Sequence, residues 1–104
     1  MNDIASAATL ATTAPLCILC VDDETNILNA LRRLLRPQGY RVLTALSGAE
    51  GLAIMADTRV DLVLSDMRMP EMDGSAFLEQ VKARSPDTIR ILLTGYADLN
   101  STIA

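Results

Sequence analysis

The chain has 104 residues, half of them apolar and 3% aromatic, so it is long enough for one domain with a largely aliphatic core. Its formal net charge is −4 and its pI is about 4.6, and without a basic stripe to neutralise phosphates it does not fit a direct nucleic-acid binder. Because the chain contains no His, it excludes a Ser-His-Asp or Cys-His catalytic site and any His metal ligand of its own.

Residues 1–15 are small and polar, and they lack the basic start and the continuous apolar stretch of a signal peptide. We therefore expect a flexible tail over residues 1–15, followed by one domain over residues 16–104. No apolar run approaches the roughly 20 residues that a membrane-spanning helix needs, so we expect no membrane association.

Residues 16–21 form the first apolar run, which contains Cys17 and Cys20. The spacing fits a redox C-x-x-C motif, but the run is typical of a strand. Residues three apart on a strand are separated by roughly 10 Å and point to opposite faces, whereas a disulfide needs Cα atoms within about 7 Å. We therefore favour two small buried hydrophobic residues and, by default, the reducing cytoplasm.

The next segment has a helical pattern that ends at the Pro-Gln-Gly of residues 37–39. Its expected apolar face consists of Ile27, Leu31, Leu34 and Leu35. Residues 40–44 are a short β-prone run. Ser47 and Glu50 then form a capping box, and the helix behind it has an expected apolar stripe. That stripe consists of Ala49, Leu52, Ala53 and Ala56.

Residues 60–65 come next, and their apolar run is typical of a strand buried on both faces. A third helix follows and stops at residues 85–87. Its apolar positions are Phe77, Leu78 and Val81. Residues 88–94 form a fourth apolar strand, which Gly95 ends, and Asp98 is placed to cap a further helix.

Strands and helices thus alternate along the whole chain. This order favours an α/β fold, a doubly wound parallel sheet with right-handed crossovers and helices on both faces. In such a sheet the carboxyl ends of all strands share one edge, and ligands bind there at the point where the strand order reverses.

Polar side chains follow three of the four strands. Asp22 and Asp23 follow the first, Asp66 follows the third, and Thr94 ends the fourth. Taken singly, each has an ordinary explanation as a helix N-cap, a loop residue or a strand end. If the first, third and fourth strands are neighbours, however, three carboxylates and a hydroxyl meet in one shallow pocket.

Three ionised carboxylates in one pocket repel one another, and either protonation of one of them or a bound cation relieves that repulsion. Oxygen ligands without Cys or His suit a hard ion, Mg²⁺ or Mn²⁺. A carboxylate beside such an ion can also be the nucleophile that accepts a phosphoryl group.

Three motifs at the strand ends, VDDE, LSDMRMPEMDG and LLTGYAD, closely resemble those of the receiver domains of bacterial response regulators, the CheY-like family. The resemblance covers residues 16–104 and implies a flavodoxin-like sheet with the strand order 2-1-3-4. The segment RILLTGYADLNSTIA is also similar to receivers of hydrogenase-control regulators or of cyclic-di-GMP phosphodiesterase regulators.

The resemblance implies a role for each matching residue. Asp66 would be the phosphoacceptor, and Thr94 would hydrogen-bond a phosphoryl oxygen. Asp23 and Asp66 would ligate Mg²⁺ directly, while Asp22 would act largely through a bound water. The backbone carbonyl of Arg68 would complete the protein ligands.

The family also has a fifth strand that carries an aromatic switch residue and ends in a Lys, and then a last helix. This chain stops at Ala104, inside the helix expected after Gly95, so these parts are absent from it. The fourth strand would then have an exposed edge, prone to pairing with another chain. A homodimer through this edge, or through the helix expected after Gly95, is one predicted assembly.

The implied function is a phosphorylation-controlled signalling switch rather than an enzyme. A sensor histidine kinase would donate the phosphoryl group to Asp66, and the state would pass to a partner or to an output domain, which is absent from this chain. A Mg²⁺-dependent phosphatase with an Asp nucleophile is an alternative, but it requires D-x-D after the first strand, whereas Asp22 and Asp23 are adjacent. A phosphorylation-independent interaction module is another.

Overall fold

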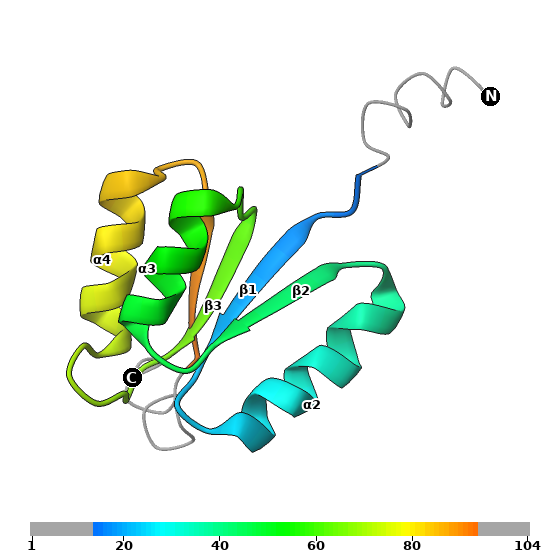
Figure 1. The fold of residues 1–104 in the computed structure, drawn as a ribbon, viewed down its shortest axis with the longest axis horizontal. Coiled ribbons are helices and arrows are strands. Elements are labelled where there is room, and N and C mark those ends of the chain that lie inside the picture. The colour runs from blue at the N-terminus through cyan, green and yellow to red at the C-terminus, as the bar shows by residue number, and fades with distance from the viewer. Residues whose placement is uncertain (1–13, 94–104) are drawn as a thin grey trace, which may run out of the picture.

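Strands and helices alternate along residues 14–93, the part of the chain that the computed structural model describes (Figure 1). The elements are β1 (Cys17–Val21), α2 (Thr25–Leu35), the short 3-10 helix η1 (Arg36–Gln38), β2 (Arg41–Ala45), α3 (Gly48–Asp57), β3 (Leu62–Asp66), α4 (Gly74–Arg84) and β4 (Ile89–Leu93). Each strand begins one or two residues later than predicted. Thr94, Gly95 and Asp98 lie outside the described residues, so the predictions for them stay predictions.

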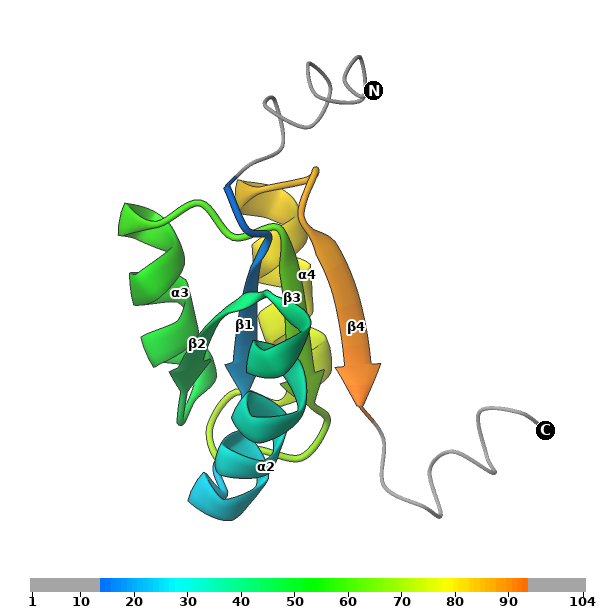
Figure 2. The same ribbon diagram turned by 90° about the vertical axis from the view of Figure 1, so that its right-hand side faces the viewer.

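The four strands form one sheet with the order β2-β1-β3-β4, and every neighbouring pair is parallel. Figures 1 and 2 show α2 on one face of the sheet and α3 and α4 on the other. Val21 pairs with Ser65, and Asp66 pairs with Leu93, so β1, β3 and β4 end at the same edge. The predicted strand order and the helices on both faces are confirmed.

The larger part of the core lies between the sheet and the helices α3 and α4. Val63 of β3 and Phe77 and Val81 of α4 are fully buried there. Phe77 fits because Gly51 of α3 has no side chain: a Cβ at that position would lie 3.0 Å from Phe77 Cζ. Removing a buried aromatic ring of this kind costs about 3–5 kcal/mol, so this contact holds α4 firmly against the sheet.

The structure corrects the predicted apolar stripe of α3. Gly48, Gly51 and Leu52 are buried, and the residues that face solvent instead are Ala49, Ala53 and Ala56. The glycines take the buried positions because an alanine there would crowd Phe77. The capping box is confirmed, since Ser47 Oγ accepts the Glu50 N–H at 3.1 Å and the Glu50 carboxylate accepts the Leu46 N–H.

A second, smaller cluster lies under α2 and contains Ile18, Cys20, Leu28 and Val42. The predicted face of α2 is partly wrong. Leu28 is buried and Leu31 and Leu35 pack beside it, whereas Ile27 and Leu34 are 40% and 65% exposed. Leu31 and Leu35 were predicted correctly, and the contact of α2 with β1 and β2 covers Leu28 in place of Ile27 and Leu34.

On the face of the sheet that carries α2, the side chains of β3 and β4 are more exposed to solvent than predicted. Leu62 and Leu64 of β3 are half-buried, not buried, and Ile89 and Ile91 of β4 are exposed. The reason is that α2 contacts β1 and β2, and within residues 14–93 no other α-helix lies on this face. The prediction of a strand buried on both faces therefore holds for one face of β3 only.

Cys17 and Cys20 are both free and buried, as predicted. They lie in different core clusters, on opposite faces of the sheet, so no disulfide joins them. Burial raises the pKa of the Cys20 thiol to about 11, although the nearby Arg32 guanidinium opposes the rise. This thiol is a packing group and stays protonated at neutral pH.

Candidate metal centre

Three carboxylates meet at the carboxyl edge of the sheet. Asp22 and Asp23 follow the last residue of β1, and Asp66 is the last residue of β3, its neighbour in the sheet. One carboxylate oxygen from each of the three lies within 4.8 Å of the others. Residues separated by more than forty positions in the sequence are therefore gathered into one cluster, as the strand order predicted.

Asp22 is the buried member of the cluster, with 5% of its surface exposed. Its Oδ1 accepts the Glu24 N–H at 2.8 Å, and its own N–H donates to the Ala45 carbonyl at 3.1 Å. Burial raises the pKa of the Asp22 carboxyl, the Glu24 N–H opposes that rise, and the charges of Asp66 and Asp23 add to it. An ionised Asp22 is thus costly in this position unless a cation offsets its charge.

The donor set fits a hard divalent cation. The three side chains offer only carboxylate oxygens, which Mg²⁺ and Mn²⁺ prefer over sulfur or imidazole ligands. Asp23 is exposed and Asp66 is partly exposed, so solvent reaches the cluster. Mg²⁺ in proteins usually keeps several waters beside one or two carboxylates, and an open cluster of this kind leaves room for them.

Hydrogen bonds hold the loop that joins Asp66 to α4, residues 67–73. The Gly74 N–H donates to the Met67 carbonyl at 2.8 Å, and Asp73 caps α4 by accepting the Ala76 N–H on its Oδ1 at 2.8 Å. This loop contains Arg68, whose side chain is exposed and whose carbonyl is a predicted metal ligand. The position of that carbonyl therefore depends on how α4 is held.

The same loop contains a strained turn that the sequence did not reveal. Glu71 has a φ of 69°, a left-handed conformation that is unfavourable for a residue with a side chain. The Met72 N–H donates to the Pro70 carbonyl at 2.7 Å across it, which closes a tight three-residue turn. Strained backbone of this kind is often found next to functional sites.

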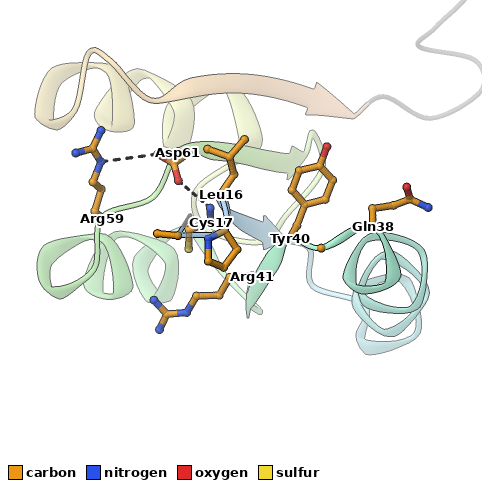
Figure 3. Close-up of a pocket in the computed structure, with 10 residues that line it drawn as sticks. Leu16, Cys17, Gln38, Tyr40, Arg41, Arg59 and Asp61 are labelled. Atoms are coloured by element: carbon orange, nitrogen blue, oxygen red, sulfur yellow. Dashed lines mark hydrogen bonds and ion pairs between the residues drawn. The ribbon is translucent and has the colours of Figure 1, made fainter. Parts of the chain in front are cut away.

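The amino edge of the sheet has a different character. A cleft of about 730 Å³ there is lined by residues from the starts of β1 and β2 and by Arg59 and Asp61 before β3 (Figure 3). Asp61 Oδ2 accepts the Cys17 N–H at 2.8 Å, and Asp61 Oδ1 lies 3.7 Å from Arg59 Nε. This carboxylate has protein partners of its own, so it joins neighbouring strands and is not a candidate cation ligand.

A family model of the response regulator receiver domain matches residues 18–104. The chain belongs to this family. The hydrogenase transcriptional regulatory protein HoxA of Cupriavidus necator is 42% identical to this receiver domain over 87 residues, which cover 84% of this chain and 18% of HoxA. This chain spans about a fifth of the length of such curated relatives.

Two solved receiver domains have the same fold as this one. The signal receiver domain of an HD domain-containing protein from Pseudomonas fluorescens gives a TM-score of 0.78 at 38% identity, covering 86% of this chain and 71% of that chain. The response regulator TrrA from Thermotoga maritima, solved in complex with Mg²⁺ and BeF, gives 0.76 at 36% identity, covering 83% and 75%. These likenesses are consistent with a phosphorylation-controlled signalling switch.

None of the helices within residues 14–93 has the length and apolar character needed to span a bilayer.

Proposed function

We propose that Asp66 of this receiver domain accepts a phosphoryl group from the phosphohistidine of a sensor histidine kinase. The observation that carries the proposal is the convergence of Asp22, Asp23 and Asp66 within 4.8 Å. A carboxylate oxygen of Asp66 forms a bond to phosphorus, and the phosphorus–nitrogen bond of the phosphohistidine breaks. The electron pair of that bond stays on the imidazole nitrogen, which takes up a proton.

We further propose that the cluster holds Mg²⁺, or Mn²⁺ in its place. Asp23 and Asp66 would ligate the ion directly, Asp22 would act largely through a water, and the Arg68 carbonyl would supply a further oxygen. When bound, the ion offsets the charge on the transferred oxygens. The relative TrrA, solved with Mg²⁺ and BeF, supports this assignment.

Thr94 is proposed to hydrogen-bond a phosphoryl oxygen of the acyl phosphate. It is the residue after Leu93, and Leu93 pairs in register with Asp66. Phosphorylation would draw Thr94 and the loop after it inward and so shift a surface between two states. Removal of the hydroxyl in Thr94→Ala should leave phosphorylation possible but weaken this response.

The direct test of the phosphoacceptor uses a small phosphodonor such as acetyl phosphate. Wild-type protein should be labelled, and Asp66→Asn should not be, because an amide is not a nucleophile of comparable strength. Asp61→Asn is the matched control, since it changes an aspartate that lies just before the start of the same strand. Labelling that persists in Asp66→Asn would show that another residue accepts the phosphoryl group.

Two competing functions lead to different results. A Mg²⁺-dependent phosphatase would turn over a chromogenic phosphate ester, and we expect no turnover because Asp22 and Asp23 are adjacent instead of spaced as D-x-D. A phosphorylation-independent interaction module would give no heat and no change in melting temperature on titration with Mg²⁺.

We also propose where this domain acts and how it assembles. We expect a cytoplasmic domain that neither binds nucleic acid directly nor associates with a membrane. It would pass its state to an output domain that regulates transcription, since the relative HoxA is a transcriptional regulatory protein. Among the described strands, β4 pairs only with β3, and we propose that its second edge pairs with another copy of this chain. A homodimer through this edge or the segment after Gly95 would elute at twice the monomer mass in size-exclusion chromatography.

A further inference from the structure

Gly74, the first residue of α4, lies closer to Asp66 than any side chain would allow. A Cβ at this position would lie 2.2 Å from the Asp66 carbonyl oxygen and 3.0 Å from its carbonyl carbon. The φ of Gly74 is not positive, so the requirement concerns space and not conformation. Any other residue must displace either the end of β3 or the first turn of α4.

Gly74 also contacts the neighbouring strand. The same Cβ would lie 2.7 Å from Leu92 Cδ1 of β4. A side chain at position 74 would therefore press on the ends of two strands at once, β3 at Asp66 and β4 two residues before Thr94. Because protein interiors are densely packed, these elements have little room to absorb the displacement.

The backbone of Gly74 holds the intervening loop as well. Its N–H donates to the Met67 carbonyl at 2.8 Å, so the chain leaves Asp66, passes Arg68 and returns to touch Asp66. The close approach thus fixes both the phosphoacceptor and the loop that contains the Arg68 carbonyl. An error of about 1 Å in such a site is enough to lower activity about 100-fold.

We propose that Gly74 is a positioning residue for phosphoryl transfer. The absence of its side chain sets the distance between the Asp66 carboxylate and the carboxylates of Asp22 and Asp23. This inference rests on the proposed function of the cluster, and it adds a residue that touches neither the metal nor the phosphoryl group.

The test compares Gly74→Ala with Gly51→Ala in the full 104-residue chain. Gly51 is also a buried helical glycine with close contacts, but those contacts are to the side chains of Phe77 and Val21 and not to Asp66. We expect Gly74→Ala to weaken Mg²⁺ binding at least tenfold and to slow phosphorylation by acetyl phosphate at least tenfold. Gly51→Ala should keep both within about twofold, measured at a temperature where circular dichroism shows each protein folded.

Wild-type affinity and rate in Gly74→Ala would overturn the proposal, and so would equal losses in both variants, since these would indicate a general packing effect. If Gly74→Ala does not fold, the double variant Gly74→Ala/Leu92→Ala removes one of the two clashes and is measured in its place. The wild-type protein supplies an independent measurement. In amide NMR spectra the Gly74 signal should shift on addition of Mg²⁺ and beryllofluoride as strongly as that of Met67, whereas the Gly51 signal should not.

An unmoved Gly74 signal in a protein whose Met67 signal does shift would also overturn the inference. Failure of the proposed function gives a different result: wild-type protein would then neither bind Mg²⁺ nor become labelled on Asp66.

Discussion

Asp61 and Asp66 stand just before and at the end of the same strand, and their surroundings are opposite. At the amino edge, Asp61 accepts the Cys17 N–H and lies near Arg59. At the carboxyl edge, Asp66 lies with two further carboxylates, and one of these is buried. A carboxylate that accepts hydrogen bonds from the protein stabilises the fold by itself, whereas the repulsion within a cluster of carboxylates is relieved by protonation or by a bound cation.

The largest expected effect is that Mg²⁺ stabilises the folded protein through the carboxylates at the carboxyl edge of the sheet and not through Asp61 at the amino edge. At a Mg²⁺ concentration of 100 times Kd, binding to the folded state should raise the free energy of unfolding by about 2.7 kcal/mol relative to EDTA. Asp23→Ala should abolish the increase, and Asp61→Ala should retain it, as measured by urea denaturation followed by circular dichroism. A similar increase in Asp23→Ala would place the ion elsewhere.

A second measurement uses Cys20, which lies inside the sheet between the two edges. Burial raises its pKa from 9.0 to about 11, so the folded state favours the protonated thiol. The stabilisation linked to this thiol is fully present below pH 9. As the pH rises through 11 it is lost, and the free energy of unfolding falls by an amount on the order of 2 kcal/mol.

The measurement for Cys20 is the difference in unfolding free energy between wild type and Cys20→Ala at pH 8 and at pH 11. Other titrating groups are common to both proteins and cancel in this difference. A difference that does not shrink at pH 11 would contradict the prediction.

Substitution of an aspartate should change the free energy of unfolding in opposite directions at the two edges. Asp61→Ala removes the acceptor of the Cys17 N–H and should destabilise the protein by about 1–2 kcal/mol. In EDTA, Asp22→Asn should instead stabilise it by about 1 kcal/mol, because the amide oxygen can still accept the Glu24 N–H while a buried charge is removed. Chemical denaturation at pH 7 measures both, and equal signs would refute the contrast.

The smallest expected effect concerns backbone strain. Glu71→Gly should stabilise the loop beside the cluster by about 0.5 kcal/mol, because glycine adopts a positive φ without steric cost. Gly39 offers the converse control at the amino edge, since its φ is 96° and nothing lies within 4 Å of its would-be Cβ. Gly39→Ala should therefore destabilise by about 1 kcal/mol through conformation alone. Differential scanning calorimetry compares the two variants with wild type.

Most of the fold was predictable because alternating strands and helices allow few arrangements. The carboxylate cluster was predictable for the same reason, since Asp22, Asp23 and Asp66 all follow strands whose ends share an edge. The buried faces of α2 and α3 were less predictable. In α2 the structure covers Leu28 in place of the predicted Ile27 and Leu34. In α3 two of the three buried residues are glycines, which give no hydrophobic signal in the sequence.

The amino-acid sequence by itself determined the class of fold, the family and the three acids of the site, because these depend on residue type and on order along the chain. Only the tertiary structure decided how Asp66 is held. The close approach of Gly74 to the Asp66 carbonyl and the hydrogen bond from Cys17 to Asp61 depend on distances between segments that the sequence does not encode locally. Such distances are set when segments far apart in the chain, here the end of β3 and the start of α4, pack densely against each other.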